Sequence, residues 1–265
     1  MKLKKYSNHY LVTAVISMVF IFAVACGDSE RSEGDRVDSD QDSVGMNDGD
    51  FESIFDGESL SGWDGDDRFW SVEDGAIVGE TTEDNPTESN TFLIWEEGEP
   101  DDFELRFQYR FLIVGDDEYG NSGIQIRSEQ FTDEDHPVNR WRVSGYQPDF
   151  AISDWIPGIL YEEVGRDILA RRGQSVLIDS DGESHVDQFA DEDELGEYIE
   201  IHSDWNDYHV YANADTIRTY INGQMMHELI DQSPEAKDEG IIAFQVHAGP
   251  PMRVEIREVD LKLLD

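Results

Sequence analysis

Hydrophobic and polar residues alternate along much of the chain after Phe51. Positions 103, 105, 107, 109 and 111 are aromatic or aliphatic, and the positions between them are Glu, Arg, Gln and Arg. A period of two is typical of a β-strand with one buried and one wet face. The pattern and its turn residues predict further strands at 76–78, 208–212, 217–221, 224–229, 240–246 and 252–263.

Turn residues separate these segments at short intervals. Asn222-Gly223 joins two of the predicted strands, and both residues tolerate a positive φ, so we expect a tight hairpin there. Glu73-Asp74-Gly75 is a turn before the strand at 76–78, and only Asp191 to Ile199 has a good helical pattern. Many short strands with turns between them predict an all-β sandwich with little helix, formed by one domain over residues 51–265.

The N-terminal segment has a different pattern. Three lysines among the first five residues precede a mostly apolar run of 15 residues, Leu11 to Ala25. A membrane span needs about 20 residues, so the run has the layout of a signal peptide instead. The small residues before Cys26 resemble the lipobox of bacterial lipoproteins, in which the cysteine is lipidated and becomes the mature N-terminus. We expect a lipoprotein signal peptide at 1–25; the alternative is an ordinary secretory signal with an unrelated cysteine.

This interpretation predicts the effect of removing the cysteine. Cys26 is the one cysteine of the chain, and a doubly acylated residue is a stable membrane anchor. Cys26→Ala should release the protein from membranes or block its processing, as measured by fractionation and by the mass of the mature chain. A variant that matures normally and stays with the membrane fraction would contradict the lipidation.

An acidic segment follows the cysteine. Residues 28–50 contain nine acids, two arginines and few apolar residues, so they cannot bury enough surface to fold. We expect 26–50 to be an acidic, disordered tether that holds the domain off a membrane. Acids just after the cysteine also resemble a surface-export signal, so the expected location is the bacterial cell envelope, at the outer membrane or cell surface.

The charge balance excludes some classes of protein. The chain has 61 Asp and Glu against 19 Lys and Arg, a formal charge of −42. Nucleic-acid binding needs clustered cations, so this acidic chain is not expected to bind nucleic acids. A disulfide scaffold needs paired cysteines, and the chain has one cysteine. Removing residues 1–25 removes three lysines and no acid, which leaves a charge of −45 with 14 arginines and two lysines. An acidic, lysine-poor surface suits a saline environment.

The charge also predicts a salt effect on stability. Self-repulsion should destabilise the folded state at low ionic strength, and about 0.1 M salt screens charges beyond roughly 10 Å. The thermal midpoint of unfolding should therefore rise from low salt to molar NaCl, and KCl should act like NaCl if screening is the cause. A flat or falling midpoint would contradict this expectation.

The sequence lacks the common catalytic motifs. Zinc-type His and Cys spacings, a Gly-x-Ser-x-Gly elbow and a phosphate loop are absent. Within Asn121 to Arg127, alternation directs Ile124 and Ile126 to the core. Gln125 and Arg127 then share the other face with Gly123, where the missing side chain leaves room. The alternative is an ordinary solvated outer face.

Two further stretches carry polar side chains in unusual density. Carboxylates, an amide, an arginine and aromatic rings gather in residues 145–166, as a sugar site needs for hydrogen bonds and ring stacking: Tyr146, Gln147, Asp149, Tyr161, Glu162, Glu163 and Arg166. The alternative is a surface salt-bridge loop. His247 ends a predicted strand beside a tight turn, which suits acid–base chemistry, or it is a hydrogen-bonded structural histidine.

An ordered set of motifs resembles one family. The opening FESIFDGESLSGW at 51–63 is similar to the start of the bacterial 3-keto-disaccharide hydrolase domain. WSVEDGAIVG at 70–79, DFELR at 102–106, NSGIQIR at 121–127 and HAGP at 247–250 continue the resemblance in order. Ala248 and Asp167 depart from it where glycine is frequent, which could reshape a loop without removing a functional group.

The resemblance implies a concanavalin A-like jelly roll of two antiparallel sheets, with a site on the concave face for 3-keto-glycosides. The ketone acidifies the C2 proton, so a base can remove it while another group stabilises the enolate. An acid then assists departure of the aglycone from C1, with or without later addition of water. We expect His247, Glu163 and Asp149 to be the acid–base or metal-binding cluster, and Arg127 and Arg166 to be clamps. The expected sugar contacts are Asn121, Gln125, Tyr146, Gln147, Tyr161 and Glu162. A divalent metal ion with oxygen and imidazole ligands is left open.

A rival interpretation comes from the same fold. Jelly rolls also host non-catalytic carbohydrate-binding modules, and fold does not fix function. An exposed Trp platform without an acid–base cluster would favour a binding lipoprotein of the cell envelope. A cleft in which His247 meets carboxylates would favour the enzyme. A purely structural envelope protein would leave the dense polar stretch unexplained.

Overall fold

The computed structural model describes residues 50–264 apart from 116–117 and 132–139. The predicted signal peptide, Cys26 and the predicted tether up to residue 49 lie outside the described residues. Among the described residues, no helix has the length and apolar composition needed to cross a membrane.

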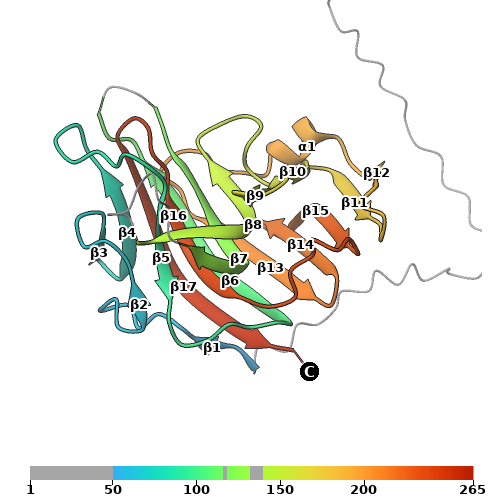
Figure 1. The fold of residues 1–265 in the computed structure, drawn as a ribbon. Coiled ribbons are helices and arrows are strands. Elements are labelled where there is room, and N and C mark those ends of the chain that lie inside the picture. The colour runs from blue at the N-terminus through green and yellow to red at the C-terminus, as the bar shows by residue number, and fades with distance from the viewer. Residues whose placement is uncertain (1–49, 116–117, 132–139, 265) are drawn as a thin grey trace, which may run out of the picture. The chain divides into compact units, whose positions relative to one another are not determined.

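The strands form two sheets that enclose one core (Figure 1). The larger has ten strands in the order β12-β11-β15-β14-β13-β6-β17-β4-β3, with β1 paired to β17. Figure 1 shows β3 and β4 at one end of this sheet and the β11–β12 hairpin, with helix α1, at the other. Its strands are β1 (Glu52–Ser53), β3 (Trp70–Glu73), β4 (Ala76–Thr81), β6 (Phe103–Leu112), β11 (Gln174–Ile178), β12 (Ser184–Gln188), β13 (Asn206–Asn213), β14 (Thr216–Ile221), β15 (Gln224–Asp231) and β17 (Met252–Leu263).

The smaller sheet has seven strands in the order β10-β9-β8-β7-β16-β5-β2. They are β2 (Trp63–Asp64), β5 (Thr91–Trp95), β7 (Asn121–Phe131), β8 (Arg142–Ala151), β9 (Leu160–Glu163), β10 (Asp167–Ala170) and β16 (Ile241–Val246). Both sheets are antiparallel except that β11 and β15 pair in parallel. The predicted all-β jelly-roll sandwich is therefore confirmed, with one parallel pair added.

Aromatic side chains fill the space between the sheets. Phe107 and Tyr208 of the larger sheet stack at 4.9 Å between ring centroids, and Phe244 of the smaller sheet meets Phe107 edge-on at 5.1 Å. The odd positions of β6 are buried and the even positions are half-buried, as the period of two predicts. Offset and edge-on aromatic pairs contribute about 0.5–1.5 kcal/mol each beyond the effect of the apolar area that the rings remove from water.

Most predicted strands are observed with small changes at their ends. The strand predicted at 252–263 is β17, and Asn222-Gly223 forms the hairpin between β14 and β15 with φ of 49° and 77°. The helix is shorter than predicted, since α1 covers only Glu192–Gly196. Asp191 caps its N-terminus, but Glu197 lies at its C-terminus, where the helix dipole disfavours an acid.

Strand β7 changes the direction of its side chains at Arg127. The register between β7 and β8 shifts between Ile126 and Glu129, and Arg127 has a φ of 45°. A β-bulge of this kind re-aims the side chain at the irregularity. Ile124 and Ile126 lie in the core as predicted, but Arg127 leaves the face that carries Gln125.

Candidate functional site

A pocket of about 420 Å³ lies against the face of the seven-stranded sheet that points away from the core. Strands β7, β8, β9 and β16 supply most of its polar residues, Asn90 and His247 come from just before β5 and just after β16, and the loop between β8 and β9 supplies an apolar rim. Six residues expected in the site from the sequence line it: Asn121, Gln147, Asp149, Tyr161, Glu163 and His247. Its size is within the range of small-molecule sites.

A chain of buried amides orients Asp149. Gln125 Nε2 donates to Gln147 Oε1 at 2.6 Å, and Gln147 Nε2 donates to Asp149 Oδ1 at 2.6 Å. The Ser128 hydroxyl donates to Gln125 Oε1 at 2.6 Å, which fixes the direction of the relay. Gln125 thus supports the pocket from beneath and is absent from its lining.

Gly123 leaves the room for this arrangement. A Cβ at position 123 would lie 2.6 Å from both Asp149 Oδ1 and Gln147 Cγ. The expectation that the missing side chain makes space on this face is confirmed. The space is filled by the two residues that carry the site's amide and carboxyl groups.

Two carboxyl groups of the pocket have raised pKa values. Burial raises the pKa of Asp149 well above its usual range, and the nearby charge of Glu163 adds to this against the hydrogen bond from Gln147. Burial also raises the pKa of Glu163, although the hydrogen bond from Asn90 Nδ2 at 3.1 Å opposes the shift. Paired carboxyls with perturbed pKa values inside a pocket are typical of acid–base sites.

His247 completes this cluster from the end of β16. Its Nδ1 lies 2.6 Å from Ala248 O and 3.0 Å from the Tyr119 hydroxyl. Because a carbonyl only accepts, this contact places a hydrogen on Nδ1, and in the neutral ring the lone pair is then on Nε2. When the ring is protonated, its charge lowers the pKa of Glu163, so the two side chains can interact electrostatically.

Arg127 is not in the pocket, and its predicted placement there is wrong. Its guanidinium donates to Asp101 O at 2.9 and 2.8 Å, to Ala214 O at 2.6 Å, and to Asp102 Oδ1 at 3.0 Å. Asp101 and Asp102 directly precede β6 and Ala214 lies in the β13–β14 turn, so these acceptors lie at the ten-stranded sheet, toward which the bulge directs the side chain. Arg127 ties the two sheets together.

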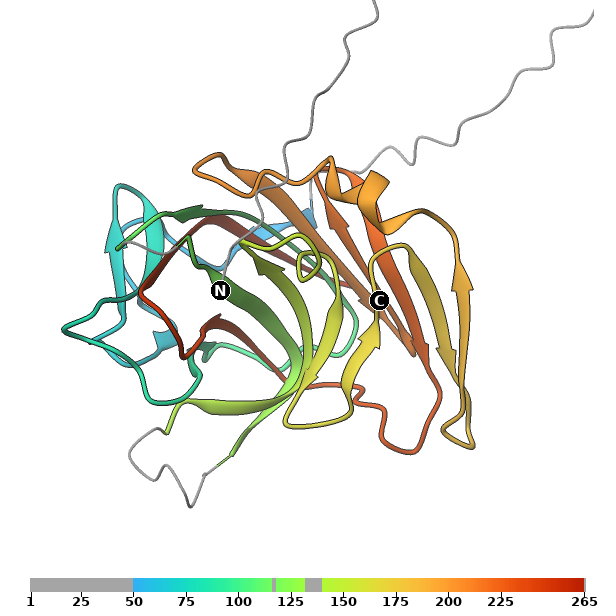
Figure 2. The same cartoon turned by 90° about the horizontal axis from the view of Figure 1, so that it is seen from above.

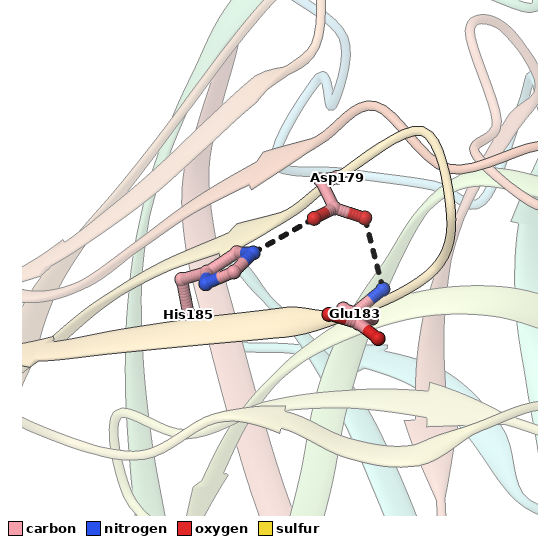
Figure 3. Close-up of side chains that lie close together, drawn as sticks. All are labelled: Asp179, Glu183 and His185. Carbon is pink, nitrogen blue, oxygen red and sulfur yellow. Dashed lines mark hydrogen bonds and ion pairs between the residues drawn. The ribbon is translucent and has the colours of Figure 1, made fainter.

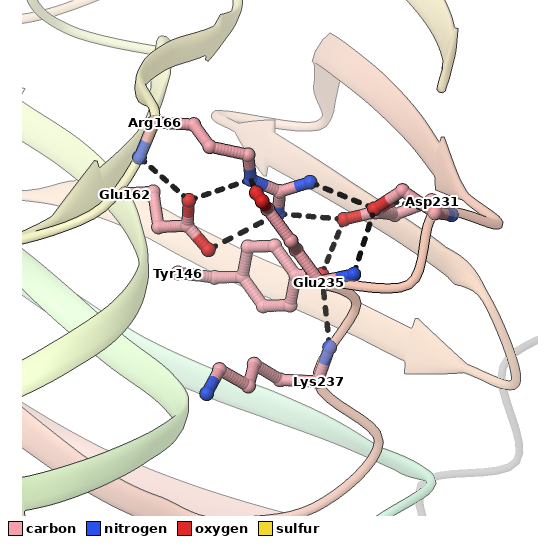
Figure 4. A network of polar contacts seen from close by, with 7 residues as sticks. Tyr146, Glu162, Arg166, Asp231, Glu235 and Lys237 are labelled. Atoms are coloured by element: carbon pink, nitrogen blue, oxygen red, sulfur yellow. Dashed lines mark hydrogen bonds and ion pairs between the residues drawn. The ribbon is translucent and has the colours of Figure 1, made fainter. Parts of the chain in front are cut away.

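Tyr146, Glu162 and Arg166 also lie outside the pocket, in a separate network (Figure 4). Arg166 pairs with Glu162 at 2.7 Å and with Asp231 at 2.7 Å, and the Tyr146 hydroxyl donates to Asp231 at 2.6 Å. Figure 4 shows Arg166 between the two carboxylates. This arrangement joins β8 and the β9–β10 turn to β15, so the part of the polar stretch that binds Arg166 is an internal salt-bridge cluster.

Comparison with family models identifies the domain. Residues 50–262 match the family described as the 3-keto-alpha-glucoside-1,2-lyase-like domain. The chain belongs to this family. Membership places the domain among carbohydrate-active proteins of the hydrolase, lyase or carbohydrate-binding kind. A comparison with curated proteins finds no match.

Solved structures share the fold of this 3-keto-alpha-glucoside-1,2-lyase-like domain. Two proteins of Parabacteroides distasonis ATCC 8503, assigned as glycosyl hydrolases, are each 14% identical to it. One has a TM-score of 0.50, with coverage of 82% of this chain and 94% of its own. The other has a TM-score of 0.51, with coverage of 81% and 99%. At this identity the likeness shows the fold alone.

The pocket of the lyase-like domain includes residues that the sequence pattern did not single out. Gln245 is two residues before His247, so the alternation along β16 places both on the same face of the sheet and could have predicted Gln245 as a site residue. Asn90 and Trp155 come from loops, where no period exists to assign their direction. The Trp155 side chain is 53% exposed at the rim of the pocket.

A buried arginine holds the loop that carries Trp155. Arg172 is 3% exposed, and its guanidinium donates to Asp154 O at 2.8 Å and to Pro157 O at 2.8 Å. A third donor reaches Glu192 O at 2.6 Å. The planar fork thus fixes both ends of residues 154–157 against helix α1.

Arg172→Lys should loosen this loop, because an ammonium group cannot reproduce the three-way geometry of the fork. We expect a several-fold rise in KM for a sugar substrate with a smaller change in kcat, measured by steady-state kinetics. Arg171→Lys, at the exposed neighbouring position, is the matched control and should leave both constants unchanged. Equal kinetics for the two variants would contradict a positioning role for Arg172.

The grouping of metal-type ligands among the described residues lies elsewhere. Asp179, Glu183 and His185 place one ligand atom each within 4.8 Å of the others, on the β11–β12 hairpin. Figure 3 shows Asp179 bound to His185 Nε2, at 2.7 Å, and to the Glu183 backbone N–H, at 3.0 Å. These hydrogen bonds stabilise the turn of the β11–β12 hairpin, which explains why the three side chains lie close together without requiring a metal ion. Asp149, Glu163 and His247 do not form so close a group among the described residues.

Proposed function

We propose that the domain cleaves glycosidic bonds of 3-keto-glycosides by removing the C2 proton and expelling the aglycone. Family membership supports the substrate class. The observation that carries the proposal is one pocket that combines His247 with two carboxyl groups of raised pKa. Without such a cluster, the same fold would suit a binding module.

His247 is the proposed base. The Ala248 carbonyl holds the hydrogen on Nδ1, so Nε2 has the lone pair that can take the C2 proton. The resulting imidazolium would be stabilised by Glu163, whose charge already interacts with His247. Tyr119, 3.0 Å from Nδ1, restricts the rotation of the ring.

Asp149 is the proposed acid. Burial raises its pKa, so it holds its proton to a higher pH than an ordinary aspartic acid, and the relay from Gln147 orients one of its oxygens. The proton would pass to the departing glycosidic oxygen as the C1–O bond breaks and a C1–C2 double bond forms. Water can then add at C1, which makes the net reaction a hydrolysis.

Neutral amides replace the expected cationic clamps in this proposal. Arg127 and Arg166 are bound elsewhere, whereas Asn121, Asn90 and Gln245 line the pocket. Amide N–H donors can stabilise a developing enolate oxygen, as in an oxyanion hole. Trp155 offers an apolar face on which a sugar ring can stack.

The experiment compares a methyl 3-keto-α-glucoside with its unoxidised parent, each with and without a chelator. We expect release of methanol from the keto compound alone, because the parent lacks the acidic C2 proton. Loss of turnover with the chelator would show that a metal ion takes part. Binding of both compounds without turnover would support the rival function, a carbohydrate-binding protein, which the exposed Trp155 favours.

We also propose that the domain works as a lipid-anchored protein of the bacterial cell envelope. The lone cysteine after an apolar run supports the anchor, and the acidic residues 28–50 suit a solvated tether. The Cys26→Ala experiment tests the anchor independently of activity.

A further inference from the structure

A second cavity lies beside the catalytic pocket. Its volume is about 450 Å³, comparable to that of the pocket. It opens between the β9–β10 hairpin, the β11–β12 turn and the loop after β15. Figure 2 shows the β11–β12 hairpin at the outer edge, near the loop that follows β15.

The two cavities share one lining residue. Ile168, on β10, lines both of them. The residue is half-buried, so part of it is exposed to solvent. A ligand longer than one sugar ring could therefore run from the catalytic pocket over Ile168 into the second cavity.

The lining of the second cavity suits a neutral sugar. Ile168 and Pro234 offer apolar surface for a ring face, and a larger set of polar residues, with Ser184 and Glu235 among them, offers groups for its hydroxyls. Most ligand cavities combine such a wall with a few placed polar groups.

The charges of this cavity argue against an acidic sugar. Arg166 is its cation, but Glu162 and Asp231 neutralise it at 2.7 Å each, and Ser233 accepts another of its N–H groups at 3.0 Å. Asp181 and Glu235 add negative charge to the lining. A carboxylate on the ligand would meet repulsion with no free cation to offset it.

The second cavity also lacks the groups that the proposed chemistry needs. No histidine is among the residues that line it in the described structure, and its arginine is held in ion pairs. It therefore has no histidine–carboxyl pair like that of the neighbouring pocket.

We propose that this cavity is a second, non-catalytic subsite for a neutral sugar unit of the same glycan. The inference rests on the proposed function, since the oxidised unit occupies the catalytic pocket and the departing part of the glycan extends over Ile168. The preferred substrates are then 3-keto oligosaccharides of neutral sugars rather than glycosides of small alcohols.

The test compares methyl 3-keto-α-glucoside with maltotriose oxidised at C3 of its non-reducing unit. In the wild-type chain we expect kcat/KM to be about tenfold or more higher for the oligosaccharide, which corresponds to about 1.4 kcal/mol of extra binding. Ser184→Trp should fill the second cavity and remove this advantage, with turnover of the methyl glycoside unchanged. Asp187→Trp, at an exposed position of the same strand that does not line the cavity, is the matched control.

Equal kcat/KM values for the two substrates in the wild type, or an equal effect of Ser184→Trp on both, would overturn the subsite. If neither keto substrate is turned over, the proposed function fails, and calorimetry with unoxidised maltotriose then tests the subsite alone. Binding that Ser184→Trp abolishes and Asp187→Trp spares would support it, and absence of binding to the wild type would overturn it. A glucuronic acid at the reducing end should weaken the wild-type interaction.

Discussion

Replacing His247 with alanine is expected to reduce turnover of a 3-keto-glucoside by about 10²- to 10⁴-fold, the usual contribution of a positioned general base. The ring is half-buried, and its hydrogen-bond contacts to the Tyr119 hydroxyl and Ala248 O are both made by Nδ1. The thermal midpoint of unfolding should therefore change little. The measurement pairs steady-state kinetics with a thermal melt of the same preparation.

His209→Ala is the matched control for this variant. His209 is also half-buried, but it pairs with Glu104 at 3.0 Å in the ten-stranded sheet, and it does not line the pocket that contains His247. Its removal should leave turnover intact. If His247→Ala loses stability and activity together, or keeps its activity, His247 is a structural histidine and the proposed base is wrong.

Alternation along the chain predicted several of the strands and the direction of some side chains of the site, because burial of one face of a strand fixes which positions point to the other face. Gln147, Asp149 and His247 come together in one pocket for this reason, although they are spread over three segments of sequence. The same rule placed Gly123 beneath them. The alternation of side-chain direction is set within each strand, so it does not depend on the length of the connections between strands.

The rule fails where the backbone departs from the strand geometry. The bulge at Arg127 turns its side chain to the opposite face of the sheet. The alternation of residue types along the sequence does not show where such a bulge occurs. Arg166 shows a different limit, since its acceptor Asp231 is 65 residues away and only tertiary structure brings them together. Composition indicated a dense polar stretch but could not separate the salt-bridge cluster from the pocket.

Asp149→Asn is expected to abolish turnover and yet raise the stability of the fold at neutral pH. The asparagine oxygen can still accept from Gln147, so the relay is kept, but no proton is available for the aglycone. Burial raises the pKa of Asp149, so the folded state binds its proton more tightly than the unfolded state. Stability from this group is then present at low pH and falls as the pH rises above its unfolded value, near 3.8.

The asparagine variant lacks this titration, so it should gain stability relative to the wild type as the pH rises above about 4. Each kcal/mol of relief corresponds to about 2–4 °C in Tm for a domain of this size. Thermal melts of both proteins from acid to neutral pH, at fixed salt, measure the difference.

Asp231→Asn is the control with the opposite sign. Burial opposes ionisation of Asp231, but the hydrogen bonds from Arg166, Tyr146 and Ser233 lower its pKa below the usual value. Its charge therefore stabilises the fold above the unfolded pKa, and that stability is lost as the pH falls through the folded pKa. Asp231→Asn should lower Tm at neutral pH, whereas Asp149→Asn raises it. A fall in Tm for both variants would show that Asp149 serves the fold, and a loss of activity could then not be assigned to its proton.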